Sequence, residues 1–197
     1  MFCLDCETLG VESTSVVLSI ALLYFDETKD DQTWESLCED TVFVKLSVKD
    51  QVDNYKRIVS KDTLEWWKKQ SDLAKDFSFT PKKSDQLAKD AINVLKLYIK
   101  KKSKNPKNDI IWVRGSIDQI VVDSLCSAME VDKLFPFWNY RDIRTFIDFN
   151  TETGSRGYAE IDMEKYPGNF NKQDVIKHNP IHDVSFDVLQ ILYGKWY

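Results

Sequence analysis

The pattern of apolar and polar positions predicts a chain that mixes strands and helices. Runs of apolar, β-branched and aromatic residues predict strands at 1–7, 15–25, 41–46, 109–113 and 135–140. Apolar residues at helical spacing predict helices at 60–69, 84–102, 117–129, 142–149 and 183–193, the first two capped by Ser60 and Ser84. The first three strands are joined by polar connections, which favours a meander. Residues 150–180 are polar with no clear period, as expected of a functional loop or lid.

The composition predicts one globular domain spanning residues 1–197. The chain is 43% hydrophobic and 30% charged, enough apolar material for a large core. No apolar run approaches the 18 or more residues of a membrane span, so we expect no membrane partner. Acidic residues at positions 5 and 7 stand where a signal peptide would be apolar, so we expect a cytoplasmic protein, in the host cytoplasm if it is encoded by a phage.

The first predicted strand carries two carboxylates, Asp5 and Glu7, in an otherwise apolar segment. Alternate residues of a strand point to the same face, which places the two side chains about 7 Å apart along it. Like charges held so close repel unless a cation lies between them, and Mg²⁺ or Mn²⁺ prefers such oxygen ligands. Acidic-x-acidic triplets also arise by chance in a chain with 32 acidic residues, so the pair needs support from other positions.

Three further residues supply that support. Asp118 follows a strand and a Gly115 turn at the start of a helix, although helix capping alone would also explain it. His182, one of two histidines, precedes Asp187 by five residues, and Asp187 lies near the buried edge of the last predicted helix. His178 stands in a loop with no carboxylate partner in sequence, and we expect it on the surface.

Taken in order, these residues resemble the three motifs of the DEDDh branch of the DnaQ-like 3'-5' exonucleases. The motif residues are Asp5, Glu7, Asp118, His182 and Asp187. Segments such as Thr63-Leu-Glu-Trp-Trp-Lys, Trp112-Val-Arg-Gly and Ile181-His-Asp further resemble exonucleases of T-even-type bacteriophages. The turn before Asp118 is a residue shorter than in that family, which leaves Asp123 as the fallback.

The resemblance implies an α/β fold of the RNase H-like type, with three α/β/α layers and a mixed five-stranded sheet whose second strand is antiparallel. It implies that Asp5, Glu7, Asp118 and Asp187 hold two Mg²⁺ or Mn²⁺ ions and that His182 is the general base. The reaction implied is removal of 5'-mononucleotides from DNA 3' ends, with single strands preferred. Thr8 and Leu9 would contact the terminal nucleotide.

Aromatic and basic residues are candidates for holding nucleic acid. At most one of Trp66, Trp67, Phe137 and Trp138 is expected to stack on a base, since most must be core, and we favour Trp66. Arg114, Arg141 and Arg144 could bind phosphate, and Arg114 is favoured. The net charge of −5 is unusual for a protein that binds nucleic acid.

Three alternatives stay open. An exoribonuclease of the same chemistry would differ only in the sugar that it accepts. A non-catalytic nucleic-acid-binding protein is disfavoured because all five active positions are filled. A redox or zinc site at Cys3 and Cys6 is disfavoured because the two side chains point to opposite faces of a strand, so we expect reduced thiols.

Overall fold

A mixed five-stranded sheet forms the centre of the computed structural model, which describes residues 1–151 and 156–196. The strands lie in the order β3-β2-β1-β4-β5. Strand β1 (Phe2–Thr8) is central, antiparallel to β2 (Val17–Tyr24) and parallel to β4 (Ile111–Val113). The edges are β3 (Val42–Lys45), antiparallel to β2, and β5 (Tyr140–Asp142), parallel to β4. The expected sheet of five strands with an antiparallel second strand is confirmed.

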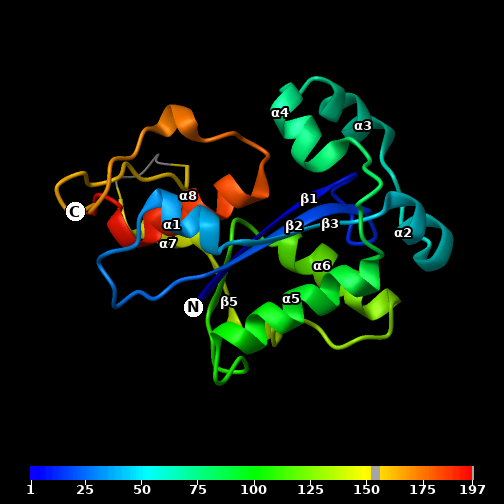
Figure 1. Cartoon of the computed structure of the whole chain (residues 1–197), viewed down its shortest axis with the longest axis horizontal. Helices are drawn as coiled ribbons and strands as arrows, with labels where there is room; N and C mark the ends of the chain where they lie inside the picture. The colour runs from blue at the N-terminus through cyan, green and yellow to red at the C-terminus, as the bar shows by residue number, and fades with distance from the viewer. Residues whose placement is uncertain (152–155, 197) are drawn as a thin grey trace.

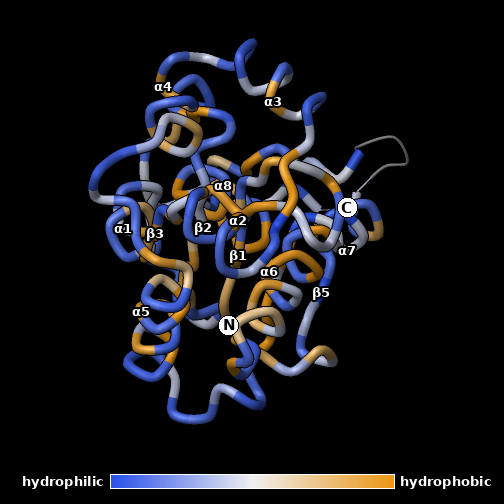
Figure 2. Tube along the Cα trace, turned by 90° about the vertical axis from the view of Figure 1, so that its right-hand side faces the viewer, coloured by the Kyte–Doolittle hydropathy of each residue, from blue (hydrophilic) through white to orange (hydrophobic). Residues whose placement is uncertain are grey.

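Helices cover both faces of the sheet (Figure 1). Helices α5 (Ala88–Lys102) and α6 (Ile117–Ala128) pack on one face, where they share a core with Phe2, Leu4 and Cys6. Helices α1 (Trp34–Asp40), α7 (Ile143–Asn150) and α8 (Pro180–Tyr193) pack on the other face, in a core that includes Cys3. Hydrophobic segments gather in the interior between these layers (Figure 2). Cys3 and Cys6 therefore lie on opposite faces, and both are free thiols, as predicted.

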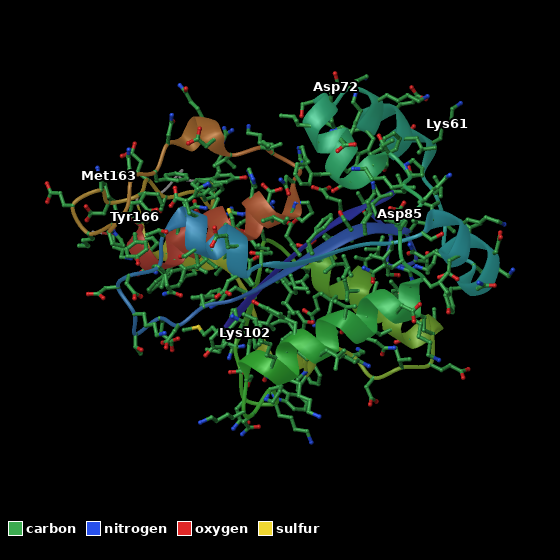
Figure 3. All side chains as sticks on the ribbon, viewed as in Figure 1. Lys61, Asp72, Asp85, Lys102, Met163 and Tyr166 are labelled. Atoms are coloured by element: carbon green, nitrogen blue, oxygen red, sulfur yellow. The ribbon has the colours of Figure 1, made fainter. Side chains whose placement is uncertain are left out.

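A group of short helices stands beyond one end of the sheet, where Lys61 and Asp72 are labelled in Figure 3. It comprises α2 (Val48–Tyr55), α3 (Lys61–Lys68), α4 (Asp72–Ala74) and a π-helical turn, Lys75–Phe79. Ser60 caps α3 as predicted, since its side chain accepts a hydrogen bond from the Thr63 N–H. Trp67 is fully buried in the core that joins this group to the sheet.

Several predicted boundaries are wrong. Helix α1 interrupts the expected connection between β2 and β3, because Trp34 and Leu37 bury themselves on the α8 side of the sheet while Thr33 caps the helix. Helix α5 begins at Ala88 without a side-chain cap, so Ser84 does not cap it. Strand β5 begins at Tyr140, after a turn of 3-10 helix at Phe137–Asn139, rather than at Phe135. Helix α8 begins three residues earlier than predicted, at Pro180.

The long segment between α7 and α8 folds back over the face that carries α1. Its one short helix among the described residues is the 3-10 turn Lys172–Asp174. The Tyr166 hydroxyl accepts a hydrogen bond from the Trp34 backbone N–H at 2.8 Å, and Figure 3 shows Tyr166 beside α1. None of the helices in the described chain combines the length and hydrophobicity needed to cross a membrane.

Candidate active site

A cavity of about 600 Å³ opens where β1, α6 and α8 meet the segment before α8. Two kinds of charged side chain line it. The carboxylates come from β1, α6 and α8 and are Asp5, Glu7, Asp118, Asp183 and Asp187. The cations are Arg114, Arg144, Lys172 and Lys177. Such a cavity can hold a phosphate together with the divalent cations that phosphate and carboxylates share.

Asp5, Glu7 and Asp183 form the closest carboxylate group. Asp5 and Glu7 alternate along β1 and face α8, and Asp183 lies in the first turn of that helix. One carboxylate oxygen from each lies within 4.8 Å of the others. Burial and the neighbouring carboxylates raise the pKa of Asp5 well above its ordinary value, and the same causes raise the pKa of Asp183 to about 8.

This group suits a hard divalent cation. The Oδ2 atom of Asp5 is buried and has no hydrogen-bond partner among the described residues. Three oxygen donors within reach of one point, with repulsion between them, are what Mg²⁺ or Mn²⁺ binds in proteins. The predicted metal-binding role of Asp5 and Glu7 thus has a suitable geometry.

Asp118 approaches the cavity from the other face of the sheet. It lies in the first turn of α6, and its Oδ1 atom accepts a hydrogen bond from the Cys6 thiol at 3.3 Å. Burial raises its pKa to about 7. The fallback residue, Asp123, does not line the cavity and instead pairs with Lys133 at 3.0 Å.

His178 lies in a loop, as predicted, but it is half-buried against the carboxylate group rather than free on the surface. Its Nδ1 atom lies 3.3 Å from Oε1 of Glu7, and this contact raises the pKa of the imidazole. The Trp66 ring packs edge-on against it, with centroids 4.8 Å apart. His178 also has a left-handed backbone, with φ +63°, which is uncommon for residues other than glycine and costs free energy.

His182, which the family resemblance suggested as the general base, does not line the cavity. Its Nδ1 atom accepts a hydrogen bond from the Ile176 N–H at 3.0 Å, and its ring packs edge-on against Trp34. Burial lowers its pKa. These contacts fix the start of α8 against α1 and direct the imidazole to that interface rather than into the cavity.

Asp187 lines the cavity but is held by Arg114. The Arg114 guanidinium donates to Asp187 from Nε at 2.9 Å and from Nη2 at 2.5 Å, and its Nη1 donates to the Gly157 carbonyl. Burial raises the pKa of Asp187, and the Arg114 charge opposes that rise. Asp187 lies outside the closest carboxylate group, where Asp183 takes the place that the sequence suggested for it.

Of the four predicted substrate contacts, Arg114 lines the cavity, whereas Thr8, Leu9 and Trp66 lie outside its lining. Thr8 ends β1, and Leu9, which follows it, is buried in the core beneath α3. Trp66 is 41% exposed beside His178, whereas Trp67 is buried and donates its indole N–H to the Thr8 carbonyl at 3.0 Å.

Phe137 and Trp138 are exposed but do not line this cavity. They precede Tyr140, which pairs with Ile111, the first residue of β4. Arg114 and Asp118, which line the cavity, follow Val113, the last residue of that strand. The place of Phe137 and Trp138 at the opposite end of the parallel strands separates them from the carboxylates.

The sequence did contain a signal for His178 and Asp183. They have the same five-residue separation as His182 and Asp187. Asn179 followed by Pro180 is a strong helix start, because asparagine caps the helix and proline suits its first position. A helix that begins at Pro180 places Asp183 in its first turn and leaves His178 outside it.

Two comparisons relate this sequence to known proteins. The sequence model of the 3'-5' exoribonuclease Rv2179c-like domain matches residues 1–187. The chain is also 30% identical over 211 aligned residues to the exodeoxyribonuclease of Enterobacteria phage T4, and the match covers 100% of this chain and 89% of the phage protein.

Proposed function

Because the chain belongs to the family of 3'-5' exoribonuclease Rv2179c-like domains, we propose that it removes nucleotides one at a time from the 3' end of nucleic acid, with single-stranded DNA preferred. The observation that carries the proposal is the group formed by Asp5, Glu7 and Asp183 with His178 against it. The strand order and the helices on both faces also support an RNase H-like arrangement.

The proposed cofactor is a pair of Mg²⁺ or Mn²⁺ ions. Asp5, Glu7 and Asp183 would hold them together with Asp118. When bound, such ions supply the positive charge that the reacting phosphate needs. Asp187 is reassigned as the ion-pair partner that orients Arg114.

His178 is the proposed general base in place of His182. Its Nδ1 atom faces Glu7, so Nε2 is the nitrogen left to take a proton from the attacking water. The ordinary pKa of histidine lies close enough to neutral pH for this role. Hydrolysis then leaves a 5'-mononucleotide and a strand shortened by one residue.

The proposed substrate contacts are Thr8, Leu9, Trp66 and Arg114. Thr8 and Leu9 lie at the end of β1, directly after the carboxylates, where a terminal nucleotide would reach. Trp66 is 41% exposed, so its ring is accessible to a base that stacks on it. Within the described part of the chain, Asp187 and Gly157 accept from three of the five Arg114 N–H groups, which leaves two for a phosphate oxygen.

Degradation of 5'-labelled strands tests the proposal. Matched 20-nucleotide DNA and RNA strands, single and double, are incubated with Mg²⁺ and the purified chain. We expect a ladder that shortens from the 3' end, fastest on single-stranded DNA, and no ladder with Asp5→Asn. Shortening of a 3'-labelled strand in many steps would contradict the proposed direction, and full activity of Asp5→Asn would contradict the site.

An exoribonuclease is the second candidate, because the matching family model is described by that activity. The same assay separates the two, since only a contact with the 2'-hydroxyl distinguishes the sugars. Faster loss of RNA than of DNA would favour the second candidate.

A further inference from the structure

Arg57 is a buried cation outside the cavity. It lies between α2 and α3 and is only 4% exposed. Within the described part of the chain, no carboxylate lies at ion-pair distance from it. Burial lowers its pKa, but an arginine remains charged at neutral pH. Burying a charge without a counterion costs several kcal/mol, so its hydrogen bonds must be unusually complete.

The Arg57 guanidinium binds neutral acceptors on two separate segments. Nε and Nη2 donate to the Ser15 carbonyl at 3.1 and 2.7 Å, and Nη2 also donates to the Ser13 carbonyl at 2.9 Å. Towards α6, Nη1 donates to the Ser124 hydroxyl at 2.8 Å and Nη2 to the Val121 carbonyl at 3.2 Å. One planar group thus joins the 13–15 turn to α6, a geometry that the single ammonium of lysine cannot reproduce.

Both of these segments continue into the proposed active site. Val121 lies about one helical turn after Asp118 on α6. The 13–15 turn packs against the residues that follow β1, because a β-carbon on Gly10 would overlap Ser15 Oγ. Two hydrogen bonds also hold Leu9 close to this turn. Its N–H donates to the Val16 carbonyl at 2.9 Å, and its carbonyl accepts from the Ser60 N–H at 2.7 Å.

We propose that Arg57 is a positioning residue for the nuclease reaction: its guanidinium fixes α6, and with it Asp118, relative to the end of β1 that carries Asp5 and Glu7. The inference rests on the proposed function. Arg57 does not line the cavity and acts only through the segments that it joins. Loss of the guanidinium would let Asp118 move away from the other carboxylates, which weakens cation binding before it affects any other step.

Titration calorimetry with Mn²⁺ tests this inference on the full chain. We expect Arg57→Met to raise the Kd for Mn²⁺ about tenfold, equivalent to about 1.4 kcal/mol, and Arg57→Lys to recover part of that loss. Nuclease activity should fall at low Mn²⁺ and recover largely at saturating Mn²⁺. The control is Leu125→Ala, a buried change in α6 that destabilises the core without removing a contact of the guanidinium.

The control separates positioning from a general loss of stability. All variants are measured at a temperature at which circular dichroism shows them folded. Equal Mn²⁺ affinity in Arg57→Met and the wild type, or an equal loss in Leu125→Ala, would overturn the inference. If Arg57→Met does not fold, Ser124→Ala replaces it, since it removes one acceptor of the guanidinium at little cost to the core. An unchanged Mn²⁺ affinity in Ser124→Ala would also overturn the inference. A folded wild type that binds no Mn²⁺ and cleaves no strand overturns both this inference and the proposed function.

Discussion

Two histidine–aspartate pairs of identical spacing overlap at the start of α8, and the structure gives them different surroundings. His178 and Asp183 lie at the carboxylate group, where His178 contacts Glu7. His182 packs against Trp34 and accepts a backbone hydrogen bond, and Asp187 pairs with Arg114. Each histidine even has a tryptophan edge against its ring, Trp66 in the first pair and Trp34 in the second.

The difference arises from where the helix begins. Asn179 and Pro180 start α8 so that Asp183 and Asp187 are one turn apart, and only the first reaches β1 closely enough to join Asp5 and Glu7. His178 lies outside the helix, where its left-handed backbone turns the ring towards Glu7. A shared spacing therefore does not define a motif unless the helix start is known.

The largest contrast is expected between the two aspartates. Asp183→Asn should lower kcat/KM at least a thousandfold, about 4 kcal/mol of barrier, because it removes one of the three closest carboxylates. Asp187→Asn should lower the free energy of unfolding by about 3 kcal/mol, since it leaves Arg114 without its counterion, and should reduce kcat/KM far less. Oligonucleotide degradation and urea unfolding measure the two effects. Inactivation by Asp187→Asn with full activity in Asp183→Asn would reverse our assignment.

The two histidines should differ by a smaller factor. His178→Ala should lower kcat about 100-fold to 1,000-fold, the usual contribution of a general base, while the folded structure remains stable. His182→Ala should keep most activity and lose about 1 kcal/mol of stability, because the Ile176 N–H loses its acceptor. Single-turnover kinetics at saturating Mn²⁺ measure the first effect and thermal unfolding measures the second. The assignment fails if His182→Ala is the variant with the slow chemical step.

Cation binding should distinguish the pairs without any nucleic acid. At 100 times its Kd, Mn²⁺ should raise the Tm of the wild type by roughly 5 to 10 °C, because it binds only the folded chain. Asp183→Asn should lose most of this shift and Asp187→Asn should keep it, each compared with its own metal-free Tm. A shift that survives in Asp183→Asn would place the cation elsewhere.

The tryptophans provide the finest contrast in activity. Trp66→Ala should raise KM about tenfold with little change in kcat, consistent with loss of stacking on one base. Trp34→Ala should leave KM nearly unchanged but lower the Tm markedly, because Trp34 is buried against Phe170 and His182. A KM increase in Trp34→Ala alone would exclude stacking at Trp66.

Sequence alone could predict the parts of the molecule that local patterns determine. The long apolar run of β2 and the two-residue period of β1 were sufficient for these two strands and for the shared face of Asp5 and Glu7, whereas the five-stranded mixed sheet was implied by the family resemblance. The place of Asp118 at the start of a helix follows from a strand, a turn and a helix in immediate succession, whereas its role in the site came from the family resemblance. In each case neighbours in sequence supply most of the information.

The parts that depend on distant neighbours could not be predicted in this way. The partner of His178 is Glu7, which lies at the other end of the chain. Strand β5 has three residues, none of them fully buried, and exists because it pairs with β4 rather than because of its own composition. The buried residues of helix α1 are Trp34 and Leu37, and two apolar residues are too few to predict a helix. Both are buried because they pack in the same core as α8.

The lining of the cavity also bears on how salt should act on this chain. The charge of Arg114 is already balanced by Asp187, so a phosphate hydrogen bond from Arg114 would release no further counterion. Arg144, Lys172 and Lys177 are then the described cavity cations able to displace counterions from a bound strand. Each phosphate neutralised on a single strand contributes about −0.7 to the slope of log affinity against log salt, so three contribute about −2. A slope of that size would mean that binding relies on the chemistry of the strand's end rather than on electrostatic attraction along its length.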